Sequence, residues 1–117
     1  MDITSRVEEI VRKENIKEGV VHIFIPHTTA AVTVNENYDP SVVRDILNTL
    51  EKIIPVGASY THREGNAHAH IKASIIGSSR SIPVEGGRLS LGTWQGIFFC
   101  EFDGPRNREV WISITGR

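Results

Sequence analysis

The sequence contains a single cysteine, Cys100, among its 117 residues. One cysteine excludes an intrachain disulfide and a zinc site built from cysteines. Any metal that the protein binds must therefore be held by His, Asp or Glu side chains.

Long hydrophobic runs are also absent. No apolar stretch approaches the roughly 18 residues needed to cross a bilayer, and the first six residues lack the basic-then-apolar order of a signal peptide. We therefore expect a soluble, cytoplasmic protein with no membrane partner.

The chain has no excess of charge of either sign. Its 13 Lys+Arg and 14 Asp+Glu residues give a formal net charge of −1, with 39% hydrophobic and 23% charged residues. This is ordinary globular composition, and it disfavours a strongly basic nucleic-acid-binding module, so no nucleic-acid partner is expected. The length fits one domain that spans residues 1–117.

Two stretches have the pattern of helices. Ser5 followed by Glu8 fits a capping box and predicts a short helix over 5–13. Asp39 and Pro40 form a strong helix start, and apolar residues at helical spacing predict a longer helix over 40–54. We interpret this second helix as scaffold.

Short β-branched and aromatic runs, separated by turn signals, predict several strands. They fall at 20–25, 29–35, 71–76, 81–84, 89–91, 94–102 and 109–115, and a long polar loop is predicted at 56–69. The fold class that this order predicts is α+β, an antiparallel β-sandwich with two helices on one side.

The five histidines are unevenly spread. His62, His68 and His70 lie within nine residues, and His27 directly follows Pro26. If 68–70 is extended, His68 and His70 point the same way and can present two imidazoles to one metal. A polar loop with surface histidines is an equally good interpretation. His22 alternates with apolar neighbours and is interpreted as a core or edge histidine.

Other side chains are candidates for binding a substrate. Asn35, Glu36 and Asn37 follow a predicted strand, where they can orient a substrate or form an ordinary turn. Lys72 and Ser74 share the predicted strand face of His70 and, with Arg88, can form an anion site or a solvated surface. Trp94 and Gln95 stand between Gly92 and Gly96, which is typical of a pocket wall or of a buried Trp at a bulge.

Several strings taken together resemble the YjbQ family, whose members are often described as secondary thiamine-phosphate synthases. They are HTTA at 27–30, NEN at 35–37, DP at 39–40, GNAHAHIKAS at 65–74, IPV at 82–84, GTWQG at 92–96 and DGPR at 103–106. Their order and spacing match the family from Asp2 to the C-terminus. Family members usually have an extended segment before the match to Asp2, so we expect either a start site upstream of Met1 or an uncovered sheet edge.

The resemblance implies a sandwich-like α+β fold, a homotrimer, and an active site with a divalent metal, commonly zinc. The family histidines carry over onto His27, His62 and His70 as metal ligands. The position of His68 is not a fixed histidine in the family, so His68 is kept only as a neighbour of the site.

The first functional hypothesis is a metal-dependent enzyme that joins a pyrimidine diphosphate to a thiazole phosphate and releases pyrophosphate. Zinc is the expected cofactor and Mg²⁺ the alternative, because diphosphate chemistry commonly uses Mg²⁺. Lys72, Ser74 and Arg88 would bind phosphate and Trp94 would stack on a ring. The full set assigned to the small phosphorylated substrate is Asn35, Asn37, Lys72, Ser74, Arg88, Trp94 and Gln95.

Two alternatives remain open. One is a trimeric protein that binds a metal or an anion without turnover. The other is a metal-assisted hydrolase in which Glu36 or Glu64 acts as the general base for a metal-bound water.

Overall fold

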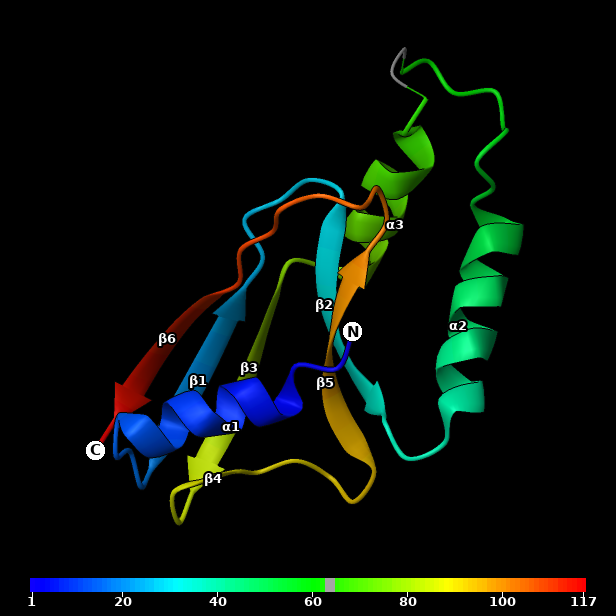
Figure 1. Ribbon diagram of the computed structural model, residues 1–117. Coiled ribbons are helices and arrows are strands. Elements are labelled where there is room, and N and C mark those ends of the chain that lie inside the picture. The colour runs from blue at the N-terminus through cyan, green and yellow to red at the C-terminus, as the bar shows by residue number, and fades with distance from the viewer. Residues whose placement is uncertain (63–64) are drawn as a thin grey trace.

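The computed structural model describes residues 1–62 and 65–117 (Figure 1). Glu64, one of the two predicted catalytic carboxylates, lies outside the described residues. The helices are α1 (Thr4–Lys13), α2 (Pro40–Ile53) and α3 (Ala67–Ile76). The strands are β1 (Gly19–Phe24), β2 (Ala30–Glu36), β3 (Ser79–Glu85), β4 (Arg88–Leu89), β5 (Gln95–Glu101) and β6 (Trp111–Gly116).

The strands form two antiparallel sheets. The larger has the strand order β4-β3-β1-β6, and the smaller pairs β2 with β5. The α+β class with antiparallel sheets is therefore confirmed, and α3 adds a third helix to the two predicted ones. None of the helices in the described part of the chain combines the length and the apolar character needed to cross a membrane.

The predicted strand at 71–76 is wrong, because this segment belongs to α3. A short apolar run such as Ile71, Ile75 and Ile76 fits a strand and a helix equally well. Three alanines between 67 and 73 favour the helix, since alanine has the highest helix propensity. The prediction that His68 and His70 point the same way is therefore also wrong. Side chains two residues apart on a helix differ in direction by about 200° around the helix axis.

The two expected helices form, with different details at their starts. Asp39 caps α2 as predicted, and its carboxylate accepts a hydrogen bond from the Ser41 backbone N–H at 2.9 Å. In α1 the capping box of Ser5 and Glu8 is not used, because the helix begins one residue earlier. The Asp2 carboxylate instead accepts from the Thr4 backbone N–H at 2.9 Å.

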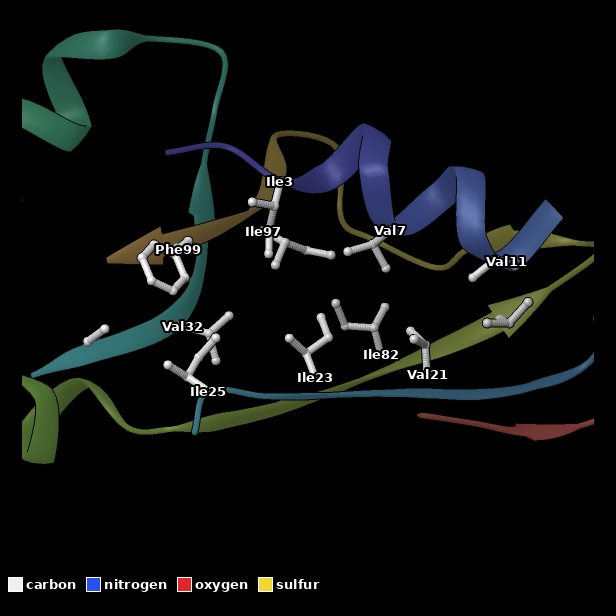
Figure 2. Packing of buried hydrophobic residues seen from close by; sticks show 12 residues of the cluster. Ile3, Val7, Val11, Val21, Ile23, Ile25, Val32, Ile82, Ile97 and Phe99 are labelled. Carbon is white, nitrogen blue, oxygen red and sulfur yellow. The ribbon is translucent and has the colours of Figure 1, made fainter. Parts of the chain in front are cut away.

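The apolar core lies between the two sheets and under α1 (Figure 2). Helix α1 contributes Val7 and Val11, strand β1 contributes Ile23, and the smaller sheet contributes Val32 and Ile97; each is no more than 2% exposed. Burial of these side chains holds the larger sheet against the smaller one. The connections that pass from one sheet to the other are fixed by the same packing.

Helix α2 has an apolar face but contributes nothing to this core. It has no buried residue, and Leu47 and Ile53 are 49% and 66% exposed. Figure 1 shows α2 standing beside α3 and the β2-β5 sheet. The predicted role of α2 as scaffold is therefore not supported by packing of its apolar face within the described part of the chain.

Candidate functional site

Two connections between the sheets run side by side and form one edge of the molecule (Figure 1). Residues 25–29 lead from β1 to β2, and residues 102–110 lead from β5 to β6. The Phe102 N–H donates to the Thr29 carbonyl at 3.1 Å, and the Glu109 N–H donates to His27 Nε2 at 2.8 Å. Helix α3 lies against the same edge, because Ile25 and Val32 donate their backbone N–H groups to Ser78 and Gly77 just after it.

Two neighbouring depressions at this edge share His27, Thr28 and His70 as a common wall. The arginine depression, of about 340 Å³, is lined by Pro26, His27, Thr28, Thr29, Asn66, His70, Asp103, Arg106 and Arg108. The serine depression, of about 360 Å³, is lined by His27, Thr28, Ala30, His70, Ala73, Ser74, Gly77 and Ser78. Both are near the lower end of the volumes typical of small-ligand sites.

His27 is held in one tautomer by its hydrogen bond. Because Nε2 accepts from the Glu109 N–H, a neutral His27 carries its proton on Nδ1. A metal ligand needs an unprotonated nitrogen, so this arrangement offers a metal neither nitrogen of His27. His27 is suited instead to donate a hydrogen bond through Nδ1.

His62 and His70 are brought together, as the predicted metal site requires. Their ring centroids are 5.1 Å apart, with the planes at 74°. Among the described residues, however, no three His, Cys, Asp or Glu side chains gather closely enough to hold a metal ion by themselves. The predicted set of three histidines therefore does not fit a metal as it stands, whereas His62 and His70 bring two imidazoles close together.

An ion pair fixes the wall of the arginine depression. Arg108 donates through Nε to Glu101 Oε1 at 2.7 Å and through Nη2 to Glu101 Oε2 and, at 2.9 Å, to Thr29 Oγ1. These hydrogen bonds from Arg108 hold the pKa of the Glu101 carboxyl below its ordinary value. Arg108 is thus committed to joining β5 to the start of β2.

Asp103 is the second carboxylate of this wall. Its Oδ2 accepts from Asn66 Nδ2 at 2.9 Å and from Arg106 Nη2 at 3.0 Å. The Asn66 hydrogen bond is the largest cause of a lowered pKa at Asp103, and the contact to Arg106 adds to it. Arg106 also donates a hydrogen bond from Nε to the Asp103 carbonyl at 2.8 Å. The turn at residues 103–106 is therefore stabilised by contacts between its own first and last residues.

Asn66 stands at the N-cap position of α3 without capping it through its side chain. Its NH₂ group points to Asp103, since only that end of the amide can donate to a carboxylate. The other end, Oδ1, is buried and has no hydrogen-bond partner in the described part of the chain. Asn66 is therefore used to tie the start of α3 to the 102–110 connection rather than to cap the helix.

The predicted residues around Glu36 lie at the opposite end of the β2-β5 ladder. Ala30 pairs with Glu101 at one end and Glu36 with Gln95 at the other, about 20 Å away for six strand residues. The Glu36 carboxylate accepts from the Asp39 N–H at 3.2 Å. Within one chain the structure therefore does not bring Glu36 to the histidines.

The polar side chains near Glu36 also form hydrogen bonds with neighbouring groups of the protein. Asn35 Oδ1 accepts from the Glu36 N–H, and Asn37 Nδ2 donates to Asp2 Oδ2 at 3.1 Å. Gln95 Oε1 accepts from the Gly92 N–H at 2.8 Å. These bonds are those of turns and strand ends.

Trp94 is 59% exposed, so it is not a buried Trp at a bulge. It lines an open depression with Glu36, Tyr38, Asp39 and Pro40 at the far end of the ladder.

Lys72 and Arg88 also lie outside the two depressions that His27 and His70 line. Lys72 is buried, and its Nζ donates to Glu51 at 2.7 Å and contacts His68 Nδ1 at 3.3 Å, which links α3 to α2. The prediction that Lys72 shares a face with His70 is wrong, because it assumed a strand. Arg88 lies in the β3-β4 hairpin near the end of α1. Ser74 does stay beside His70, one helical turn on, and donates to the His70 carbonyl at 2.8 Å.

The polar residues that complete the arginine depression were not predicted as site residues from the sequence. They are Thr29, Asn66, Asp103, Arg106 and Arg108. Asp103 and Arg106 belong to the DGPR string, which contributes to the family resemblance but was not assigned to the site. Its two opposite charges three residues apart were the available signal.

Comparison with known proteins gives the family. The family model described as "UPF0047 protein YjbQ-like" matches residues 1–117. The chain belongs to this YjbQ/UPF0047 family. A UPF0047 protein of Methanocaldococcus jannaschii is 50% identical over 116 residues, which cover 99% of this chain and 84% of the relative. YugU of Bacillus subtilis is 48% identical over 117 residues, which cover 99% of this chain and 89% of the relative.

Solved structures of YjbQ/UPF0047 proteins have the same fold. A Clostridium acetobutylicum protein, described as an uncharacterized member of the family, superimposes with a TM-score of 0.96 at 54% identity and covers 98% of this chain and 89% of its own. A YjbQ-like protein of Sulfolobus solfataricus gives a TM-score of 0.95 at 42% identity and covers 100% of this chain and 86% of its own. These names specify a family and no reaction, so the activity has to be argued from the site.

The ion pair of Arg108 with Glu101 predicts a pH dependence of stability. The folded pKa of Glu101 lies below its ordinary value of 4.5. The stabilisation of the folded state by the ionised Glu101 carboxylate is therefore complete above pH 4.5. It is lost as the pH falls through the folded pKa of Glu101. We expect the difference in free energy of unfolding between wild type and Glu101→Gln to be largest at pH 6 and to shrink steadily below pH 4.5. Urea denaturation from pH 6 to pH 3 measures it.

The control for this series is Glu14→Gln, which changes a carboxylate in the turn after α1. Its difference from wild type should stay nearly constant over the same range. A constant difference for Glu101→Gln as well would show that the ion pair does not contribute to stability.

Proposed function

We propose that this YjbQ-family protein binds a small phosphorylated molecule at the edge formed by residues 25–29, residues 102–110 and α3, which we call the histidine edge. The phosphate group of this molecule lies in the arginine depression. One observation carries the proposal: two arginines and two histidines converge on the same depression. Guanidinium groups bind phosphate oxygens through short, charge-assisted hydrogen bonds.

Arg106 is the residue that we assign to the phosphate. It uses two of its five N–H groups on Asp103, and its side chain is 56% exposed, so the remaining donors face an open surface. Arg108 is only 12% exposed and is committed to Glu101, so its role is to hold the wall in place. The start of α3 adds to the attraction for an anion, because helix N-termini carry a partial positive charge.

His27 and His70 line the same depression as Arg106. His27 donates from Nδ1 to a ligand oxygen while Nε2 stays bonded to the Glu109 N–H. His70 is set by α3 and paired with His62. These groups orient the phosphate and leave its far side toward solvent.

We further propose that His62 and His70 hold a divalent cation beside the phosphate, with zinc expected for imidazole ligands and Mg²⁺ as the alternative. When bound there, the cation would neutralise negative charge on the phosphate oxygens. His27 is left out of the ligand set because of its tautomer. The remaining coordination positions would be filled by oxygen atoms of the ligand or of water.

The reaction to test first is the one that the family resemblance implies, in which a pyrimidine diphosphate and a thiazole phosphate are joined and pyrophosphate is released. The arginine depression supports the phosphate part of this proposal. Trp94 lies at the other end of the β2-β5 ladder, so the ring-stacking role proposed for it has no support within one chain. We expect the reaction to take place in the cytoplasm.

A second candidate is binding without turnover. Asp103 is the one carboxylate among the described residues that line the arginine depression, and it is bonded to Arg106 and Asn66. A general base needs an unengaged proton-accepting group near the ligand, and Glu36 does not provide one here. This arrangement favours a metal- or anion-binding protein over the hydrolase hypothesis.

We also propose a homotrimer, as the family resemblance implies. The exposed apolar face of α2 supports this proposal, because an apolar surface on a helix with no buried residue is costly in water unless another chain covers it.

The phosphate role of Arg106 predicts a specific loss of binding. We expect Arg106→Gln to weaken inorganic phosphate binding about 10- to 100-fold, which corresponds to the loss of one or two charge-assisted hydrogen bonds. Isothermal titration calorimetry with phosphate measures the effect. Arg88→Gln, which removes the same charge in the β3-β4 hairpin, is the matched control and should bind as wild type does. Equal weakening in the two variants would place the phosphate elsewhere or show only a loss of net charge.

The cation proposal predicts a pattern over three histidines. Protein purified without chelators and without a His-tag should contain about one metal ion per chain by elemental analysis. We expect His70→Ala to lose the metal, and His27→Ala to keep it. His22→Ala, on the exposed face of β1, is the control and should also keep it. Loss in His27→Ala as complete as in His70→Ala would instead support the three-histidine set, and absence of metal from the wild type after reconstitution would remove the cation from the site.

The assembly proposal predicts that a charge on the apolar face of α2 separates the subunits. Sedimentation velocity should show a trimer for wild type and a smaller species for Leu47→Glu. Asn48→Glu adds the same charge one residue further on and should remain a trimer. A wild-type monomer, or a trimer that persists in Leu47→Glu, would contradict an α2 interface.

A further inference from the structure

The wall formed by His27, Thr28 and His70 separates two depressions of different chemistry. On one side lie Arg106, Arg108 and Asp103, which make the arginine depression strongly polar and charged. On the other side, the described residues that line the serine depression bring no charged or aromatic side chain apart from the two imidazoles. The two volumes are of similar size, so neither is a minor extension of the other.

The serine depression is built from small residues on a fixed backbone. Ala73, Ser74 and Gly77 come from α3 and its end, and Ser78 follows them. The carbonyl of Gly77 accepts from the Val32 N–H at 3.1 Å, which ties this end of α3 to β2.

Gly77 has a φ of +102°, and a Cβ there would stand 3.0 Å from Arg80 Nη1. Backbone of this kind cannot accommodate a larger residue without strain. The backbone therefore favours a glycine without a side chain at this point of the depression wall.

Arg80 lies beside Gly77 but does not line the serine depression. It is the arginine nearest to Gly77, yet its guanidinium donates to the Ile76 and Ser79 carbonyls. Those hydrogen bonds close the end of α3. The polar groups that remain at the serine depression are hydroxyls, of Thr28, Ser74 and Ser78, and these suit an uncharged ligand that both donates and accepts hydrogen bonds.

We propose that one ligand spans both depressions: a phosphate monoester whose phosphate lies in the arginine depression and whose small hydroxylated organic group lies in the serine depression. This inference rests on the proposed phosphate site and adds the chemical class of the rest of the molecule. The ester oxygen then lies at the shared wall, beside His27 and His70.

Ser74 is the residue that we assign to recognition of the organic group in the serine depression. Its hydroxyl donates to the His70 carbonyl and keeps its oxygen lone pairs for a ligand. A large side chain at this exposed helical position would fill the serine depression and leave the arginine depression intact.

The test compares two probes, glycerol 3-phosphate and methyl phosphate, by isothermal titration calorimetry. Wild type should bind glycerol 3-phosphate about tenfold more tightly, as expected for one or two further hydrogen bonds. In Ser74→Phe this preference should disappear, because glycerol 3-phosphate falls to the affinity of methyl phosphate while methyl phosphate is unchanged. Ile75→Phe, which places the same ring on an exposed neighbouring position, is the matched control and should keep the preference.

The outcomes separate this inference from the proposed function. If wild type binds neither probe, the phosphate site itself is wrong and the inference goes with it. If wild type binds both probes equally, or if Ser74→Phe weakens both to the same extent, the phosphate site stands and the two-part ligand is wrong. Ser78→Phe fills the same depression from the loop and replaces Ser74→Phe should that variant fail to fold.

Discussion

The histidine edge depends on one topological constraint: two chain connections cross between the sheets at the same place. Strand β1 pairs with β6 in the larger sheet, and β2 pairs with β5 in the smaller one. The link from β1 to β2 must therefore run beside the link from β5 to β6. His27 on the first link meets the Glu109 N–H on the second, and the position of the imidazole follows from the pairing of the four strands.

The core makes this constraint rigid. Ile23 from the larger sheet and Val32 and Ile97 from the smaller one are fully buried between the layers. Close packing of this kind leaves little freedom for the sheets to slide. The two links consequently keep their spacing, and so do the depressions that they border together with α3.

The sequence could predict the elements whose signals are local. Asp39 before Pro40 marks the start of α2, and the structure uses that cap. The strand pattern predicts most of the sheet. The resemblance implies a site that contains His62 and His70, and the structure brings their ring centroids to 5.1 Å from each other.

Other features depend on contacts that no local pattern contains. The segment of helix α3, Ala67–Ile76, was predicted as the end of a loop followed by a strand. A short apolar run fits the side-chain periodicity of a helix and that of a strand equally well. Arg108 was not singled out, since its partners Thr29 and Glu101 lie on two different strands or links. The tautomer of His27 depends on a backbone N–H 82 residues further along the chain.

The charges at the edge also bear on how such a site discriminates between ligands. Arg106 and Arg108 are already paired with Asp103 and Glu101, so the ligand-free site is close to neutral when the histidines are uncharged. A phosphate that binds the remaining donors of Arg106 lies next to the Asp103 carboxylate, whose negative charge repels it and reduces the electrostatic gain of binding. Phosphate alone is then a weak ligand, and selectivity has to come from whatever else the ligand contacts. The uncharged, fixed surface on the other side of His27 and His70 offers those additional contacts without a competing internal ion pair.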